Sequence, residues 1–137
     1  MNSITAIVIT RDEERNIVDC LESVSWVNEI IVVDCGSVDK TRELAREFTE
    51  KVFVKPWEGY SEAKRFAIQR GSRDWVLWID ADERVTPELR AEILALPDDP
   101  NYAGYEFPRK AFFLGRWIRH AGWYPGYVMR LFRRRAF

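Results

Sequence analysis

Short apolar runs alternate along this chain with segments in which apolar residues return at helical spacing. Continuous runs at residues 4–9, 29–33 and 75–79, and a shorter one at 52–54, predict strands. Helical spacing lies between the runs; after the first, for example, apolar residues at positions 17, 21 and 24 share one stripe. Strands that alternate with helices predict an α/β fold, with a mostly parallel, Rossmann-like sheet and helices on both faces.

Local signals predict where the helices begin. Asp12 is the expected N-cap of the first helix, with two acidic residues in the first turn, where they complement the helix dipole. Thr86, followed by Pro87, is the expected cap of a helix that continues to about residue 96. Residues 61–69 are expected to form a further helix.

The alternation ends at a Pro-Asp-Asp-Pro turn. We expect one domain over residues 1–137, because a chain of this length buries roughly 68% of its unfolded surface and needs neither disulfides nor a structural metal. Residues 1–96 form its α/β part. Residues 97–137 form an aromatic and basic β segment, with short strands expected at 102–108 and 127–132.

Charge divides the chain near the same place. Residues 1–100 carry 13 Lys and Arg against 21 Asp and Glu, whereas residues 101–137 carry 8 against 1, and the whole chain has a net charge of −1. A near-neutral chain lacks the broad positive field of a general nucleic-acid binder, so we expect no nucleic-acid partner. The division suits an acidic, cation-binding part joined to a basic segment that faces anions, a membrane surface or a partner.

Cysteine usage and apolar content indicate an intracellular protein. Cys20 and Cys35 are accompanied by a single histidine, His120, which is neither a zinc-site pattern nor a disulfide framework. Cys20 falls at a helical position expected to be buried, and Cys35 has no basic neighbour that would activate it as a nucleophile. No apolar run approaches the roughly 20 residues that span a bilayer, and the N-terminus lacks signal-peptide features. We therefore expect a soluble, cytoplasmic protein.

Polar residues follow three of the predicted strands, at residues 10–13, 34–37 and 80–83. In open α/β sheets, ligands bind beyond the carboxyl ends of the strands, near the point where the strand order reverses. We expect these three segments to meet on one rim.

Asp80 and Asp82 are two residues apart at the end of an apolar strand. In extended backbone both carboxylates leave on the same side, where they can share a hard cation such as Mg²⁺ or Mn²⁺ that bridges to phosphate oxygens. The alternative is a solvated acidic turn that leads to the Thr86 cap.

The other candidates each have a structural alternative. Asp34, Gly36 and Ser37 suit contacts to a ribose or a base, or else a turn whose polar side chains bond their own backbone. Lys64 and Arg65 suit contacts to a diphosphate, or else the solvated side of a helix.

The segment at residues 116–125 combines aromatic and basic residues. Aromatic faces beside arginine suit a sugar ring or its phosphates, while Trp117 and Trp123 also suit a place in the core. His120 is either a general base or a hydrogen-bonded structural group.

The motifs at residues 7–14, 32–39 and 78–84 together resemble the family 2 glycosyltransferases, which have the GT-A fold, and the match covers almost the whole chain. Residues 56–60 and 115–125 resemble the bacterial glucosyltransferases that build the inner core of lipopolysaccharide or lipooligosaccharide. The resemblance implies inverting, metal-dependent transfer from a UDP-sugar, UDP-glucose in that subgroup, to a lipopolysaccharide-type saccharide or glycolipid acceptor.

The resemblance also implies roles for the motif residues. Asp80 and Asp82 correspond to the family's catalytic DxD motif, with Asp82 as the direct ligand of Mg²⁺ or Mn²⁺ and Asp80 nearer the ribose and phosphate. Residues 1–96 then bind the nucleotide, and residues 97–137 form an incomplete acceptor-side segment. The residues implied to surround the uridine and diphosphate are Thr10, Arg11, Glu13, Asp34, Gly36, Ser37 and Lys64.

The chain departs from the family pattern in several places. Cys35 replaces a common Ser or Asp, Val38 and Lys40 replace the usual Thr and Gly, and Arg65 stands where Asn is usual. The family's catalytic segment is longer, and its general base corresponds to a position after Phe137. The chain therefore resembles a truncated enzyme that binds donor but completes transfer poorly.

Two hypotheses come from other functional classes. A metal-dependent phosphohydrolase would use Asp80 as its nucleophile. A non-catalytic interaction module would use the surface after Pro100, and apolar faces left uncovered there favour a homo-oligomer. The terminal arginines, Arg133, Arg134 and Arg135, suit peripheral contact with anionic lipid on the cytoplasmic face of the inner membrane, or a solvated tail.

Overall fold

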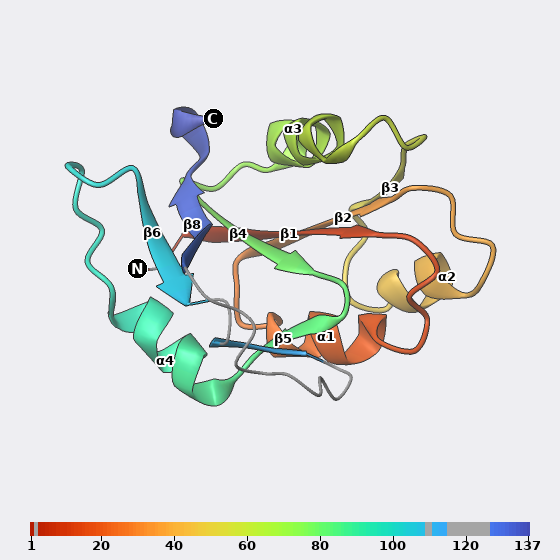
Figure 1. Ribbon diagram of the computed structural model, residues 1–137, viewed down its shortest axis with the longest axis horizontal. Helices are drawn as coiled ribbons and strands as arrows, with labels where there is room; N and C mark the ends of the chain where they lie inside the picture. The colour runs from red at the N-terminus through yellow and green to blue at the C-terminus, as the bar shows by residue number, and fades with distance from the viewer. Residues whose placement is uncertain (2, 109–110, 115–126) are drawn as a thin grey trace.

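The computed structural model describes residues 1, 3–108, 111–114 and 127–137. Within these residues the main sheet has the strand order β3-β2-β1-β4-β8-β6 (Figure 1). The first four strands are parallel, while β8 and β6 are antiparallel to their neighbours. The strands are β1 Ile4–Thr10, β2 Glu29–Asp34, β3 Val52–Val54, β4 Trp75–Asp80, β6 Gly104–Pro108 and β8 Tyr127–Arg133.

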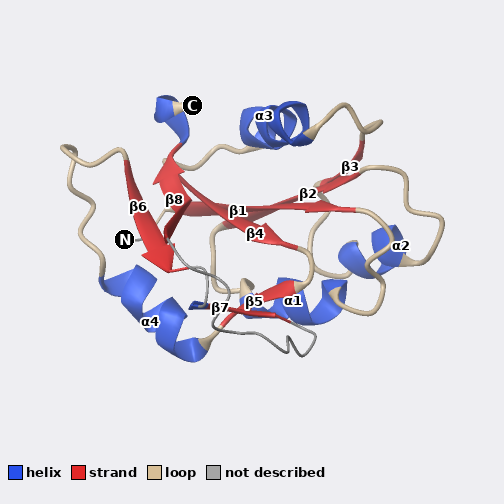
Figure 2. Cartoon of the chain, in the orientation of Figure 1, coloured by secondary structure: helices blue, strands red, loops and turns tan. Residues whose placement is uncertain are grey.

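Helices cover both faces of this sheet, with α3 on one side and α1, α2 and α4 on the other (Figure 2). Successive strand residues point to opposite faces, so that Val8 packs in the α1 layer while Ile7 packs with Ala67 of α3. The expected α/β fold with a mostly parallel sheet is confirmed. The helices are α1 Ile17–Ser23, α2 Thr41–Ala45, α3 Tyr60–Arg70 and α4 Pro87–Ala95.

A second, two-stranded sheet pairs β5 (Glu83–Val85) with β7 (Phe112–Leu114) in antiparallel register. The sequence pattern did not predict it, because three residues are too few to display a strand period. The strands expected at 102–108 and 127–132 are confirmed as β6 and β8. A 3-10 turn at Arg134–Ala136 follows β8.

The expected start of the first helix is wrong, because α1 begins only at Ile17, after Asn16. Asp12 instead has a positive φ of 52° and bonds to the loop that follows β2. Its backbone N–H donates to Ser37 Oγ at 2.8 Å, and its carboxylate accepts from the Val38 N–H at 2.8 Å. Asp12 therefore joins two loops and does not cap α1.

The start and end of α4 are confirmed. Thr86 Oγ1 accepts a hydrogen bond from the Leu89 N–H at 3.1 Å, and Pro87 occupies the first turn.

Arg133 is not part of a solvated or lipid-binding tail, which corrects one expectation. It is buried as the last residue of β8, 2.7 Å from Asp98 Oδ1, and its guanidinium lies 4.3 Å from the centre of the Trp75 ring. Arg134 and Arg135 are exposed. The aromatic ring and the carboxylate together hold this end of β8 against β4.

Glu29 carries a buried carboxylate at the start of β2. It accepts hydrogen bonds from Thr5 Oγ1 at 2.7 Å, from the Ser72 N–H at 2.7 Å and from Ser72 Oγ at 3.1 Å, and it pairs with Lys51 Nζ. Burial opposes ionisation, but these bonds outweigh it and lower the pKa of Glu29 to about 2.

We expect Glu29→Gln to remove an acid-sensitive part of the stability. The folded pKa is depressed, so the carboxylate's contribution is complete above about pH 4.5 and is lost as the pH falls toward 2. Because Lys51 is half-exposed, we expect a cost of about 2 kcal/mol at pH 7. Urea unfolding of both proteins at pH 7 and at pH 2.5 measures this, and a difference that does not shrink in acid would refute it.

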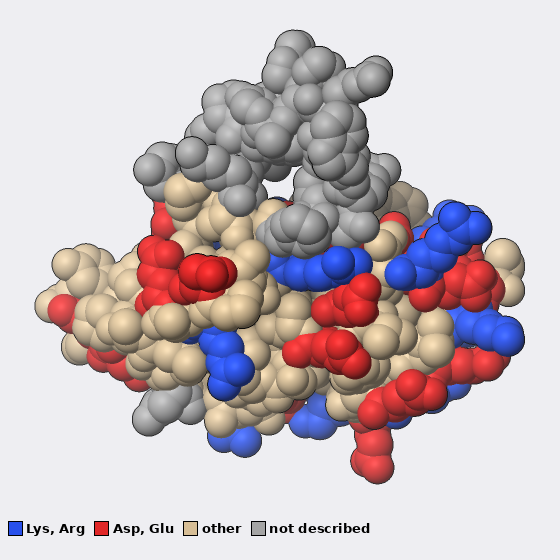
Figure 3. Space-filling view, turned by 90° about the horizontal axis from the view of Figure 1, so that it is seen from below, with Lys and Arg blue, Asp and Glu red and all other residues tan. Residues whose placement is uncertain are grey.

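The face that carries α1, α2 and α4 shows acidic and basic side chains interspersed, without an unbroken patch of either sign (Figure 3). No helix in the part of the chain that the structure describes has the length and apolar character needed to cross a bilayer. Cys20 and Cys35 are both buried free thiols.

Candidate functional site

A hollow of about 410 Å³ lies at the carboxyl ends of β1 and β4, the two strands between which the strand order reverses. Figure 1 shows both strands pointing to the same edge of the sheet. All three expected segments reach this hollow, so their meeting on one rim is confirmed. The lining residues are Ile9, Thr10, Arg11, Glu13, Cys35, Trp57, Tyr60, Asp80, Ala81 and Asp82.

Strand register brings these ends together. Thr10 lies opposite Asp34 in the β1–β2 pair, and Ile9 lies opposite Asp80 in the β1–β4 pair. The Cys35 N–H donates to the Thr10 carbonyl at 2.9 Å, which extends the pairing by one residue. The Thr10 hydroxyl is buried without a hydrogen-bond partner among the described residues, so it has bonding capacity left for a ligand.

Asp80 ends β4, and a short turn carries the chain through Ala81 and Asp82 into β5. The Asp80 N–H donates to Glu83 Oε1 at 2.8 Å, and the Asp80 carbonyl accepts from Cys20 Sγ of α1 at 3.5 Å. Burial, and then the carboxylates of Glu83, Asp80 and Asp82, raise the pKa of the Cys20 thiol, so it stays a neutral donor.

The donor set fits a hard divalent cation. Asp80, Asp82 and Glu13 all line the hollow, and carboxylate oxygens are ligands preferred by Mg²⁺ and Mn²⁺. Among the described residues, no three or more His, Cys, Asp and Glu side chains are arranged so that they could together hold a metal ion. An ion at this place would therefore have to be held by only one or two protein carboxylates, with water and substrate phosphate at its remaining positions.

Asp34 is turned away from the hollow into its own loop. Its buried carboxylate accepts from the Gly36 N–H at 3.2 Å, from the Ser37 N–H at 2.9 Å and from Ser37 Oγ, and Arg42 Nε lies 3.9 Å away. Gly36 has a φ of +104°, which favours glycine at this turn. The structure thus matches the local-turn alternative for all three residues, while Cys35 between them lines the hollow.

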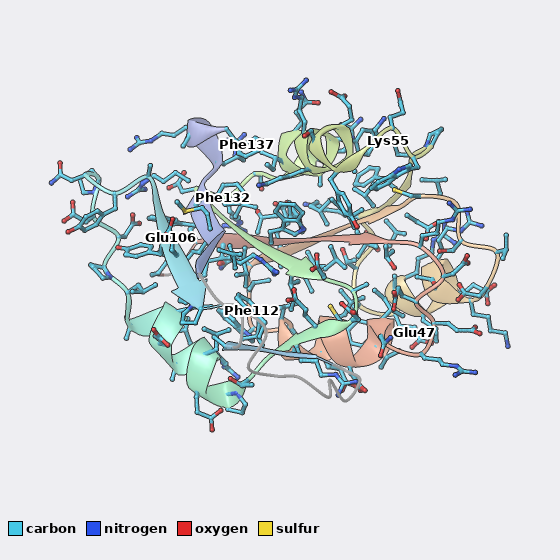
Figure 4. All side chains as sticks on the ribbon, in the orientation of Figure 1. Glu47, Lys55, Glu106, Phe112, Phe132 and Phe137 are labelled. Carbon is cyan, nitrogen blue, oxygen red and sulfur yellow. The ribbon has the colours of Figure 1, made fainter. Side chains whose placement is uncertain are left out.

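Lys64 does not line this hollow. Its ammonium lies over the rings of Trp78, Phe132 and Phe137, at 4.1, 4.8 and 4.5 Å from their centres. Figure 4 shows the two phenylalanines together on the α3 side of the sheet. Burial, and then the charge of Arg130, lower the pKa of Lys64. The ammonium of Lys64 thus lies among aromatic rings and near the charge of Arg130, and its contact with a diphosphate stays a prediction.

Several residues at this site had no role assigned from the sequence, although all but Arg130 lie in segments that the motifs singled out. Trp57 and Tyr60, in edge-to-face contact at 4.8 Å, add aromatic surface to the hollow, and only their place in the motif at 56–60 signalled them. Glu83 and Arg130 form a buried ion pair behind Asp80. An arginine within the apolar strand β8 was the available signal for that pair.

Cys35 borders the hollow as expected, and it is not activated. Burial, and then the charge of Asp34, raise the pKa of its thiol, so it is a poor nucleophile there. The expectations for His120, Trp117, Trp123 and the motif at 115–125 lie outside the described residues.

The profile of Glycosyl transferase family 2 matches residues 5–137. An uncharacterized glycosyltransferase of Rickettsia felis is 41% identical over 110 residues, which are 77% of this chain and 39% of that protein. The lipopolysaccharide core biosynthesis glycosyltransferase LpsC of Rhizobium meliloti is 33% identical over 120 residues, 82% of this chain and 44% of that protein. The chain therefore spans less than half the length of these curated relatives.

Among solved structures, the chain is similar to glucosyl-3-phosphoglycerate synthase of Mycobacterium tuberculosis, which was crystallised in complex with Mg²⁺ and uridine diphosphate. The TM-score is 0.54 at 28% identity, and the match covers 61% of this chain and 34% of that one. The likeness agrees with the α/β architecture described above.

Proposed function

The chain belongs to glycosyl transferase family 2, with the GT-A-like fold that its motifs implied, and on that premise we propose that it binds a UDP-sugar together with Mg²⁺ or Mn²⁺ at the ends of β1 and β4. One observation carries the proposal: Asp80 and Asp82 line the same hollow as Thr10, Arg11 and Glu13, although 67 or more residues separate the two groups along the chain. Family membership accounts for these carboxylates, so the phosphohydrolase and interaction-module hypotheses are not needed to explain them.

Asp80 and Asp82 would hold the divalent ion, which when bound neutralises the charge of the departing diphosphate. Thr10 has a free hydrogen-bonding hydroxyl for the nucleotide, and Arg11 brings an exposed cation to the rim. Trp57 and Tyr60 present ring faces and edges to the bound sugar or nucleoside. Asp34, Gly36 and Ser37 form the hydrogen-bonded turn that holds Cys35 in the lining of the hollow.

The donor sugar, the stereochemistry of transfer and the acceptor are proposed from the resemblance to related proteins. We propose UDP-glucose as donor, transfer with inversion, and a saccharide or glycolipid of the lipopolysaccharide type as acceptor, since LpsC is a lipopolysaccharide core glycosyltransferase. Peripheral contact with the cytoplasmic face of the inner membrane would use Arg134 and Arg135, because Arg133 is engaged in the fold. Pairing of two copies of the chain stays a prediction.

Calorimetric titration of UDP tests the nucleotide site. We expect binding in the presence of Mn²⁺ or Mg²⁺ that weakens by at least about tenfold when EDTA removes the metal, because the ion bridges the carboxylates and the diphosphate. ADP under the same conditions is the control for the base. Equal affinity for UDP with and without metal would contradict the proposal that Asp80 and Asp82 hold an ion that binds the diphosphate.

A further inference from the structure

We propose that Glu83 and Arg130 are positioning residues for the turn that carries Asp80 and Asp82, and that through them strand β8 controls metal-dependent donor binding. This inference rests on the proposed function. Glu83 is the last residue of the strand-end segment at 80–83, but that segment assigned it no role, and Arg130 lies outside all three segments.

The pair is buried and joined by two hydrogen bonds. Arg130 Nη1 donates to Glu83 Oε1 at 2.6 Å and Arg130 Nη2 donates to Glu83 Oε2 at 3.1 Å. Their side chains are only 10% and 8% exposed. A bidentate arginine–carboxylate contact fixes the plane and the direction of the carboxylate, so the orientation of Glu83 is set from β8.

Glu83 transmits that orientation to the turn. Its Oε1 atom, already bound by Arg130, also accepts the backbone N–H of Asp80 at 2.8 Å. Glu83 thereby holds Asp80, the last residue of β4, which precedes it by three positions in the chain. A shift of the Glu83 side chain would move the Asp80 backbone, and with it both carboxylates that line the hollow.

Arg130 also reaches β4 directly. Its Nη1 donates to the Trp78 carbonyl at 3.3 Å, and its Nη2 lies 3.6 Å from Asp80 Oδ2. The guanidinium therefore contacts three groups around the turn: the Trp78 carbonyl before it, the Asp80 carboxylate at its start and the Glu83 carboxylate at its end. Arg130 and Trp78 line a neighbouring hollow of about 380 Å³, and Tyr60 and Asp80 line both hollows.

The chemistry of the pair suits orientation better than stabilisation. Taking two charges out of water is costly, and apolar side chains of similar size often stabilise a fold as well or better. The surroundings would suit apolar residues, since the guanidinium lies 4.8 Å from the centre of the Phe112 ring, which Figure 4 shows beside β7. What apolar groups cannot supply is a fixed acceptor for the Asp80 N–H.

The same strand offers a matched control. Arg133 is buried on β8, pairs with Asp98 at 2.7 Å and lies over Trp75, at the opposite end of β4 from the turn. Its loss should disturb the packing of β8 without touching the turn.

The experiment compares Glu83→Gln and Arg130→Lys with the controls Asp98→Asn and Arg133→Lys. Mn²⁺ affinity is measured by the electron paramagnetic resonance signal of free Mn²⁺ in the presence of UDP, UDP affinity by calorimetry with Mn²⁺ and with EDTA, and stability by thermal unfolding. We expect Mn²⁺ affinity to fall about tenfold in the first two variants, as for other groups that orient metal ligands, and less than twofold in the controls. Any UDP binding that remains in EDTA should be unchanged in all four.

The outcomes separate the two proposals. Equal Mn²⁺ affinity in the test and control variants, or losses that follow thermal stability in all four, would overturn the positioning role while leaving the nucleotide site intact. A wild-type protein that binds UDP without regard to metal would overturn the proposed function itself, and the positioning role with it. Should Arg130→Lys fail to fold, Glu83→Gln decides alone, because it keeps the size of the side chain but cannot accept from both guanidinium nitrogens, so the orientation set by Arg130 is lost.

Discussion

Replacing Asp82 by alanine is expected to abolish the metal-dependent part of UDP binding. Asp82 presents its carboxylate to the hollow from the turn between β4 and β5, beside Asp80, and it is the proposed direct ligand of the ion. An ion held by only one or two protein carboxylates loses much of its protein contact when one is removed. We expect UDP affinity in Mn²⁺ to fall roughly 100-fold, to the level that the wild-type protein shows in EDTA.

Asp74→Ala is the control for this experiment, because Asp74 is an exposed carboxylate that precedes β4 at the far end of the same strand. It should bind UDP and Mn²⁺ as the wild-type protein does. Metal-dependent UDP binding that survives in Asp82→Ala would show that the ion, if it binds, is held elsewhere.

Trp75→Ala should cause the largest loss of stability, about 4 kcal/mol, because it removes a large, fully buried side chain from the core. Trp75 lies on β4 where the α/β part meets the later strands. Its Nε1 donates to Asp98 Oδ1 at 3.1 Å, Arg133 lies over its ring, and the Tyr105 ring is 5.6 Å away.

Urea unfolding measures this loss, and two variants divide it into parts. Trp75→Phe keeps most of the ring and loses the bond to Asp98, for an expected cost of about 1–2 kcal/mol. Trp57→Ala removes a half-exposed tryptophan and should change the free energy of unfolding by less than about 0.5 kcal/mol. A cost below about 1.5 kcal/mol for Trp75→Ala would contradict the role assigned to this side chain.

The order of strands and helices could be predicted because the apolar runs of the parallel strands are continuous and the helices between them have helical spacing. Strand β4, covered on both faces, shows this most clearly. Features that depend on distant partners could not be predicted. Asp12 resembles an N-cap locally, but Ser37 and Val38, from another loop, bind it and delay the start of α1.

The same distinction holds at the site. Thr10, Arg11, Asp80 and Asp82 were identifiable because they follow strands directly, and the carboxyl ends of parallel strands share one edge. The partner of Glu83 is 47 residues away along the chain, and no local pattern connects the two. The sequence around Lys64 did not reveal the aromatic rings beside its ammonium, because Trp78 and Phe132 come from strands β4 and β8; its contact with a diphosphate stays a prediction.

The bonds that join the loops after β1 and β2 have a thermodynamic consequence. Besides the two bonds of Asp12, the Glu13 N–H donates to Thr41 Oγ1 at 2.9 Å and the Glu14 N–H donates to Asp39 Oδ2 at 3.2 Å. With the Lys40 N–H, which donates to Glu14 Oε2 at 3.2 Å, five backbone N–H groups are committed before any ligand arrives. Such a preorganised rim loses little conformational entropy on association, so that most of the favourable contact energy with a nucleotide is retained as affinity.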